Sequence, residues 1–134
     1  MEKVTLITGG NKGLGYETAK ELKAKGYKVY IGSRNEERGQ QASKELGVDY
    51  VQLDVSDDKS VQQAFETISN KEGRVDVLIN NAGISGGFAK VADFTAKDVE
   101  KVYNTNVFGI VRMMNTFIPL LEKSEQPVDR KSVV

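Results

Sequence analysis

Short apolar segments rich in β-branched residues alternate with longer amphipathic segments along this 134-residue chain. The longer segments space their apolar residues as one face of a helix, and Val61, Ala64, Phe65 and Ile68 are an example. Alternation of strands and helices produces right-handed crossovers and a parallel sheet. The sequence therefore predicts a single α/β domain. Strands are expected at residues 4–8, 28–32, 49–53 and 75–79.

The expected helices cover residues 14–25 and 35–46, a segment after Ser56, a segment that starts near Thr95, and residues 106–121. Ser56 is the expected N-cap of the third helix, and Thr95 with Asp98 resembles a capping box. Residues 131–134 look like the opening of a fifth strand. We therefore expect residues 1–134 to form one domain that is incomplete at its C-terminal end.

Cysteine and histidine are both absent from the sequence. Disulfides, Cys/His zinc sites and a Ser-His-Asp triad are therefore excluded, no metal site is expected, and acid–base chemistry falls to carboxylates, Lys or Tyr. The 19 basic residues balance the 19 acidic ones, which argues against a broad nucleic-acid-binding face. Uninterrupted apolar runs reach about four residues, whereas a bilayer span needs about 20. With no signal peptide before the first strand, a cytoplasmic protein that does not bind membranes is expected.

The first expected strand leads directly into a glycine-rich loop, Thr8-Gly9-Gly10-Asn11-Lys12-Gly13-Leu14-Gly15, and a helix follows. Glycine adopts positive φ without steric cost and lets a backbone approach a pyrophosphate closely. The start of the following helix offers unpaired N–H groups and the positive end of the helix dipole. The loop therefore predicts a phosphate site, and the alternative is a strand–helix turn that binds no ligand.

Three further motifs follow in order along the chain. Asp54-Val55 ends the third expected strand, Asn80-Asn81-Ala82-Gly83 follows the fourth, and Asn106 lies in Thr105-Asn106-Val107-Phe108-Gly109. Together with the glycine loop, these motifs resemble the short-chain dehydrogenase/reductase family, of the kind that includes NADPH-dependent carbonyl reductases, over the whole chain. The resemblance implies a Rossmann-type doubly wound parallel sheet, in strand order 3-2-1-4 with the start of strand 5. It also implies carbonyl reduction or alcohol oxidation by hydride transfer.

The resemblance further implies roles for individual residues. Asp54 lies beside the adenine, and Asn106 belongs to the catalytic group, where it kinks its helix and holds a water in a proton relay. The alternatives are that Asp54 only caps its own loop, that the Asn-Asn-Ala-Gly turn is structural, and that Asn106 is a surface residue. The expected cofactor-binding residues are Gly9, Asn11, Lys12, Gly13, Leu14, Gly15, Arg34, Asp54, Val55, Asn81, Ala82 and Gly83.

In dinucleotide-binding folds, an acidic residue about 20 residues past the glycines binds the ribose 2′-hydroxyl. Here that position falls in residues 32–35, which contain no Asp or Glu. A carboxylate repels a 2′-phosphate, whereas Arg34 can bind it with paired donors, and Lys12 offers a second cation. The sequence therefore predicts NADP(H) over NAD(H). The alternative is that Arg34 only opens the next helix, paired with Glu36 or Glu37.

The family's chemistry also needs a Ser that binds the carbonyl, a Tyr general acid, and a Lys four residues after the Tyr that lowers the Tyr pKa. The family pattern puts these residues beyond Val134. Tyr16 and Lys20 match the spacing, but they lie directly behind the phosphate loop and are not expected to be catalytic. We therefore expect the 134-residue chain alone to be inactive or nearly so.

The expected partner is a small carbonyl or alcohol substrate. The last helix carries Met113, Met114, Phe117, Ile118 and Leu121, and in the family this helix belongs to the usual subunit interface, so a homo-oligomer is one expectation. The alternative is ordinary packing against the sheet. The competing function is a non-catalytic dinucleotide-binding or regulatory protein, and a third reading is a chain with no stable function.

Overall fold

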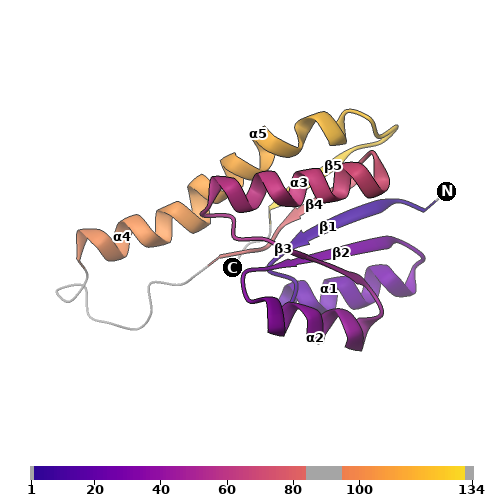
Figure 1. Cartoon of the computed structure of the whole chain (residues 1–134), viewed down its shortest axis with the longest axis horizontal. Helices are drawn as coiled ribbons and strands as arrows, with labels where there is room; N and C mark the ends of the chain where they lie inside the picture. The colour runs from indigo at the N-terminus through magenta and orange to yellow at the C-terminus, as the bar shows by residue number, and fades with distance from the viewer. Residues whose placement is uncertain (1, 84–94, 132–134) are drawn as a thin grey trace.

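The computed structural model describes residues 2–83 and 95–131. Strands and helices alternate strictly as far as the fourth strand, as the sequence predicts (Figure 1). In chain order the elements are β1 (Val4–Thr8), α1 (Gly13–Ala24), β2 (Lys28–Ser33), α2 (Glu36–Leu46), β3 (Asp49–Gln52), α3 (Asp58–Glu72), β4 (Val77–Asn80), α4 (Ala96–Tyr103), the π-helical turn η2 (Asn104–Phe108), α5 (Gly109–Leu121) and β5 (Val128–Lys131).

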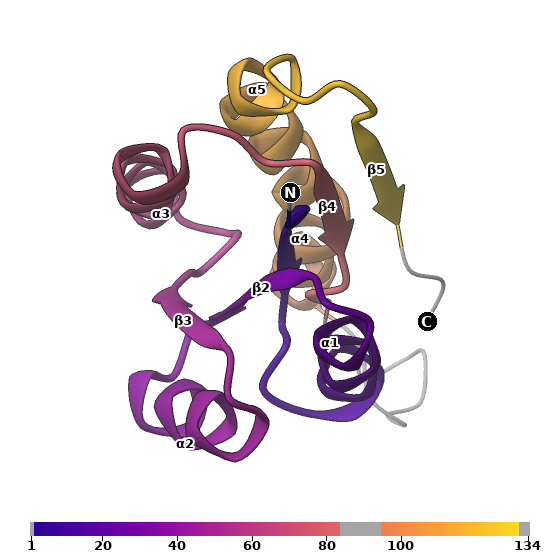
Figure 2. The same ribbon diagram turned by 90° about the vertical axis from the view of Figure 1, so that its right-hand side faces the viewer.

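The strands form one parallel sheet in the order β3-β2-β1-β4-β5. Helices α1 and α2 cover one face of this sheet, and α3 and α5 cover the other (Figure 1 and Figure 2). This arrangement confirms the predicted Rossmann-type sheet with a fifth strand beside the fourth. The strand order reverses direction at β1, because β2 and β3 lie on one side of it and β4 on the other. Ligands of such sheets bind at the carboxyl ends of the strands beside this reversal.

The core has two layers because successive residues of a strand point to opposite faces of the sheet. Leu6 of β1 packs in the layer beneath α3 and α5, and the next residue, Ile7, packs in the layer above α1 and α2. Phe65 of α3 and Phe117 of α5 meet edge to face at 5.7 Å between ring centroids. Both faces of β1 are therefore buried, which explains its unbroken apolar and β-branched sequence.

Two strands begin at other residues than predicted. The fourth begins at Val77 rather than at Val75, because the Val75 N–H donates to the carbonyl of Leu120 at the end of α5. The fifth begins at Val128, three residues before its predicted start at Lys131, and the Val128 N–H donates to the Asp76 carbonyl at 2.8 Å. Residues 132–134 lie outside the described residues.

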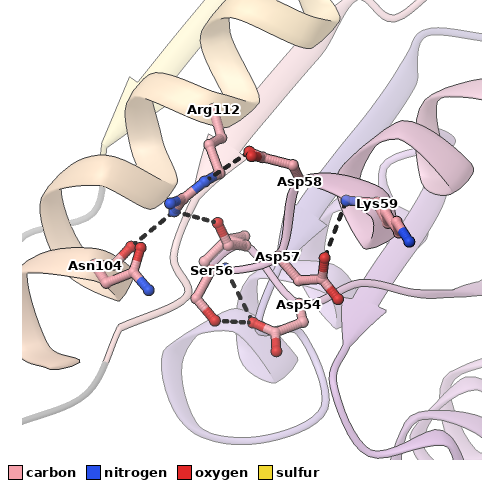
Figure 3. A network of polar contacts seen from close by, with 8 residues as sticks. Asp54, Ser56, Asp57, Asp58, Lys59, Asn104 and Arg112 are labelled. Carbon is pink, nitrogen blue, oxygen red and sulfur yellow. Dashed lines mark hydrogen bonds and ion pairs between the residues drawn. The ribbon is translucent and has the colours of Figure 1, made fainter.

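The prediction that Ser56 caps α3 is wrong. Asp57 is the N-cap, and its carboxylate accepts the Lys59 N–H at 3.0 Å. Ser56 instead donates both its N–H and its hydroxyl to Asp54 Oδ1, at 2.9 and 2.6 Å (Figure 3). The N-cap is one residue later than predicted because the Ser56 hydroxyl donates to the Asp54 carboxylate instead of capping the helix.

The two helices predicted at the end of the chain form one continuous helical segment. Thr95 and Asp98 make the predicted capping box at its start. No break separates α4 from α5; the π-helical turn η2 joins them, and Asn106, the predicted start of the last helix, lies inside this turn. Among the described residues, no helix is both long and apolar enough to cross a membrane.

Helix α5 buries one side and exposes the other. Met113 and Phe117 are fully buried, whereas Val111 and Ile118 are exposed, together with Tyr103 of α4. The predicted packing against the sheet is therefore confirmed for the buried side. Self-association through the exposed side stays a prediction.

A buried carboxylate, that of Asp76, joins the start of β1 to the segment that leads into β5. Its Oδ2 accepts the Val4 N–H at 2.7 Å and Arg74 Nε at 3.1 Å, and its Oδ1 accepts the Ser124 hydroxyl at 2.5 Å. Burial alone would raise the pKa of Asp76, but the hydrogen bonds from Ser124, Val4 and Arg74 outweigh burial and lower it. The ionised form is therefore the one that stabilises the fold.

We expect Asp76→Asn to lower the free energy of unfolding of the full-length protein by about 1–3 kcal/mol at pH 7, because it leaves buried donors without a charged acceptor. The pKa of Asp76 lies lower in the folded than in the unfolded chain, so its contribution is fully present above the ordinary value of 3.8. It is lost as the pH falls through the folded-state value, and the difference between variant and wild type should then shrink. Chemical denaturation at pH 7 and at acidic pH measures both, with exposed Glu122→Gln as the control. A pH-independent difference would contradict this account.

Candidate functional site

A cleft of about 380 Å³ opens where β1, β2 and β4 end. It brings together most of the residues predicted to bind a cofactor, except Gly15 and Asp54. Asn106, the predicted catalytic residue, does not line it either. Its walls also contain five residues that the prediction missed: Ser33, Asn35, Arg38, Leu53 and Thr105. The predicted residues that line it are Gly9, Asn11, Lys12, Gly13, Leu14, Arg34, Val55, Asn81, Ala82 and Gly83.

The glycine loop has the backbone that its sequence predicts. Gly9 and Gly13 have φ values of 65° and 59°, in the left-handed region that favours glycine. The loop ends at Lys12, the N-cap of α1, whose side chain makes no capping hydrogen bond, and the first turn of α1 contains no acidic residue. The first N–H groups of α1 therefore face the cleft without a side-chain acceptor, which suits an anion.

The loop after β4 lies directly against the glycine loop. The Thr8 hydroxyl at the end of β1 accepts the N–H groups of Asn81 and Ala82, each at 2.9 Å. The Asn81 side-chain amide donates to the Gly9 carbonyl at 3.1 Å. A Cβ at Gly15 would lie only 2.5 Å from this amide nitrogen. Gly15 therefore makes room for the Asn81 side chain instead of lining the cleft, and the Asn-Asn-Ala-Gly turn has a structural role.

Cationic side chains gather at the end of β2. Lys12, Arg34 and Arg38 all line the cleft, and no Asp or Glu of the described residues is among its lining. Arg34 forms no ion pair within 4.0 Å in the described ranges, so the alternative pairing with Glu36 or Glu37 is not observed. The sequence signal for Arg38 is its spacing of four residues after Arg34, but this spacing places Arg38 beside the cleft only once the start of α2 at Asn35 is known.

Helix α2 starts in a way that turns both arginines toward the cleft. Asn35 is its N-cap and accepts the Arg38 N–H at 2.9 Å, and the Ser33 hydroxyl donates to the Asn35 carbonyl at 3.1 Å. Asn35 and Ser33 therefore fix the path of the backbone between the end of β2 and the first turn of α2. This path places Arg34 before the helix and Arg38 inside its first turns, both beside the cleft.

Asp54 does not line the cleft, whereas its neighbour Val55 does. The Asp54 carboxylate binds the Ser56 N–H and hydroxyl (Figure 3). The Asp54 N–H donates to the Ser60 hydroxyl at 2.8 Å. The alternative in which Asp54 caps its own loop therefore agrees with the structure. Contact of Asp54 with an adenine stays a prediction.

Asn106 lies across from the loop after β4. A Cβ at Gly83 would be 3.2 Å from Asn106 Oδ1, so the absence of a side chain at Gly83 lets the carboxamide approach this loop. The preceding residue, Thr105, is buried and lines the cleft. The structure thus brings Asn106 to the same loop as the predicted cofactor residues, and its catalytic role stays a prediction.

Tyr16 and Lys20 lie on α1, behind the glycine loop. Tyr16 packs against the core layer between the sheet and helices α1 and α2, and its hydroxyl donates to Glu45 Oε1 at 3.2 Å. Desolvation and the Glu45 carboxylate raise the pKa of Tyr16, which opposes use of its phenolate. Tyr16 therefore has a packing role, and Lys20 faces solvent.

Comparison with known proteins agrees with this arrangement. The family model described as short chain dehydrogenase matches residues 3–128. Short-chain dehydrogenase/reductase tropE of Talaromyces stipitatus is 37% identical over 94% of this chain and 51% of its own length. The (+)-neomenthol dehydrogenase of Capsicum annuum is 32% identical over 93% of this chain and 54% of its own length.

A solved structure shows the same fold. The 3-ketoacyl-(acyl-carrier-protein) reductase of Brucella melitensis, complexed with NADH, superposes with a TM-score of 0.90 at 30% identity, over 96% of this chain and 56% of the other. This chain spans about half the length of the relatives it matches. Because the family model covers nearly all of its residues, the chain belongs to the short-chain dehydrogenase family.

Proposed function

We propose that this chain is the cofactor-binding portion of an NADP(H)-dependent oxidoreductase that interconverts a carbonyl and an alcohol. The observation that carries the proposal is the cleft at the carboxyl ends of β1, β2 and β4. Its wall combines the uncapped start of α1 with three cationic side chains, and no Asp or Glu of the described residues lines it. A ligand that carries several phosphate groups suits this combination of a helix start and basic side chains.

The residues present fit a phosphorylated dinucleotide. The glycine loop and the start of α1 would hold the pyrophosphate, because positive φ at Gly9 and Gly13 keeps the backbone free of side chains there. Lys12, Arg34 and Arg38 would hold a 2′-phosphate. The related reductase whose structure contains NADH supports a nicotinamide cofactor, and these cations support its phosphorylated form. When bound, this cofactor would supply or accept the hydride.

The other end of the cleft would hold the reacting part of the cofactor. Asn81, Ala82 and Gly83 line it with one small and one absent side chain, which leaves room beside the loop. Asn106, across from Gly83, would hold a water that passes a proton. We propose, as the resemblance implies, that the Ser that binds the carbonyl and the Tyr and Lys that deliver the proton lie outside residues 1–134. We therefore propose that these residues are the first part of a larger single domain, as the span of about half of each relative supports.

We expect Arg34→Ala to weaken NADPH binding by the full-length protein about 10- to 100-fold, because a charge-assisted hydrogen bond to phosphate contributes about 1.5–3 kcal/mol. NADH binding should change by less than about threefold. Arg34→Asp should reverse the preference, since a carboxylate repels the 2′-phosphate and accepts from the 2′-hydroxyl. Isothermal titration calorimetry with both cofactors measures the difference.

Lys44→Ala is the matched control for Arg34→Ala, because Lys44 is also an exposed cation of α2 but does not line the cleft. It should leave both affinities unchanged. Equal losses of NADPH and NADH affinity in Arg34→Ala would show that Arg34 does not read the 2′-phosphate and would overturn the assignment of NADP(H).

The 134-residue chain alone should not oxidise NADPH above the blank with any aldehyde or ketone, because its single Tyr-x-x-x-Lys pair, Tyr16 and Lys20, lies on the far side of the glycine loop. The full-length protein should turn over at least one such substrate. Absorbance at about 340 nm follows the reaction, and NADPH fluorescence in the same sample shows whether the chain binds the cofactor. Turnover by the 134-residue chain that matches the full-length protein would refute this account of the proton donor.

A further inference from the structure

The helix that carries Asn106 contains an inserted residue. Helices α4 and α5 are joined by η2, in which hydrogen bonds span five residues instead of four. Such π turns are rare, are less favourable than the α-helix, and persist where other contacts compensate. The Asn104 side chain does not compensate, since its oxygen is buried and meets no hydrogen-bond donor among the described residues. A contact from a neighbouring part of the helix is therefore one way to stabilise the turn.

Arg112, on α5, makes that contact. Its Nη1 donates to the carbonyl of Asn104, the first residue of the turn, at 3.1 Å (Figure 3). The same nitrogen donates to the Val55 carbonyl at 3.2 Å. One guanidinium nitrogen carries two hydrogens, so both bonds form at once. Arg112 therefore joins the turn that carries Asn106 to a residue that lines the cofactor cleft.

The third contact of Arg112 is an ion pair with Asp58. Arg112 Nε and Asp58 Oδ1 are 2.9 Å apart, but the Asp58 side chain is 86% exposed, against 24% for Arg112. Water screens an ion pair that is exposed on one side, so this pair contributes little by itself. The bonds to the two carbonyls, which are partly buried, are the ones that fix the position of the turn.

The start of α5 also packs closely against Val55, independently of Arg112. A Cβ at Gly109 would lie 2.8 Å from Val55 Cγ2 and 3.3 Å from the Val55 carbonyl oxygen. The helix therefore approaches Val55 as closely as a backbone without a side chain allows. Two separate contacts, the Gly109 backbone and the Arg112 side chain, hold the end of η2 against the wall of the cleft.

We propose that Arg112 is a positioning residue, which fixes the π turn and thereby sets where Asn106 lies relative to the cleft. Arg112 does not line the cleft, and it acts through Asn104 and Val55. Its catalytic consequence rests on the proposed function, because it needs Asn106 to take part in the reaction. Its structural consequence, the position of the π turn, does not.

The test uses the full-length protein with Arg112→Met, which keeps an apolar stem of similar reach and removes all donors. We expect kcat to fall about 10- to 100-fold, since a displacement of about 1 Å at a reacting group costs this much. KM for the carbonyl should stay within about threefold, because no binding group is removed. Hydrogen exchange of amides 104–109 should become faster, because the Asn104 carbonyl of the turn loses the Arg112 donor.

Two further variants separate positioning from a general loss of stability. Arg112→Lys, whose ammonium can reach one carbonyl but lacks the planar fork, should have an intermediate kcat and thereby rescue part of the loss. Asp58→Asn removes the exposed partner and keeps both carbonyl bonds, so kcat and amide exchange should match the wild type within about threefold. If Arg112→Met does not fold, kcat and the exchange of amides 104–109 are compared between Arg112→Lys and Asp58→Asn.

Either of two results would overturn the proposal. One is unchanged kcat and unchanged exchange of amides 104–109 in Arg112→Met or Arg112→Lys. The other is a lower melting temperature with wild-type kcat, which is what a purely structural role predicts. Failure of the proposed function is distinguishable, because the wild-type protein would then lack reductase activity while the exchange of amides 104–109 would still depend on Arg112.

Discussion

The cleft depends on the hydroxyl of Thr8, which joins the carboxyl end of β1 to the loop that follows β4. This hydroxyl is buried at the end of β1 and accepts two backbone N–H groups from the loop that follows β4. A partly buried N–H left without an acceptor costs more free energy than one ordinary hydrogen bond contributes. The Asn81 N–H also donates to the Ile79 carbonyl at 3.1 Å, so this cost concerns mainly the Ala82 N–H. The separation between the glycine loop and the loop after β4 is therefore fixed by the Thr8 hydroxyl, together with the Asn81 amide that donates to the Gly9 carbonyl.

Glycine is required on both sides of this contact because the two loops lie so close together. A Cβ at Gly9 would meet the Ala82 backbone at 3.0 Å, and one at Gly15 would meet the Asn81 side chain. The loop after β4 then presents Gly83 to Asn106 on the helical segment. Two glycines beside the β1–β4 contact and a third opposite Asn106 thus let three segments that are distant in sequence meet at one end of the sheet.

The features that depend on near neighbours could be predicted from the sequence. They include the strands, the positive φ of the glycine loop, and the capping box of Thr95 and Asp98. Features that depend on competition between groups for the same hydrogen bond, or on tertiary structure, could not be predicted from the sequence. Ser56 is a good N-cap by type, yet Asp54 binds its hydroxyl first. Arg38 was missed because its role depends on how Asn35 starts α2 beside the cleft, which is a matter of tertiary structure.

The π turn explains why the sequence predicted two helices where the structure has one continuous segment. One residue more than an α-helical turn rotates all later side chains by about 100° about the helix axis, so the apolar faces before and after the insertion do not align. The pattern alone therefore indicates a break. In the structure, α5 buries Met113 and Phe117 against the sheet, and Asn106 lies beside the loop after β4. Arg112, which follows the insertion on α5, donates to the Asn104 carbonyl and so links the residues after the irregular turn to its first residue.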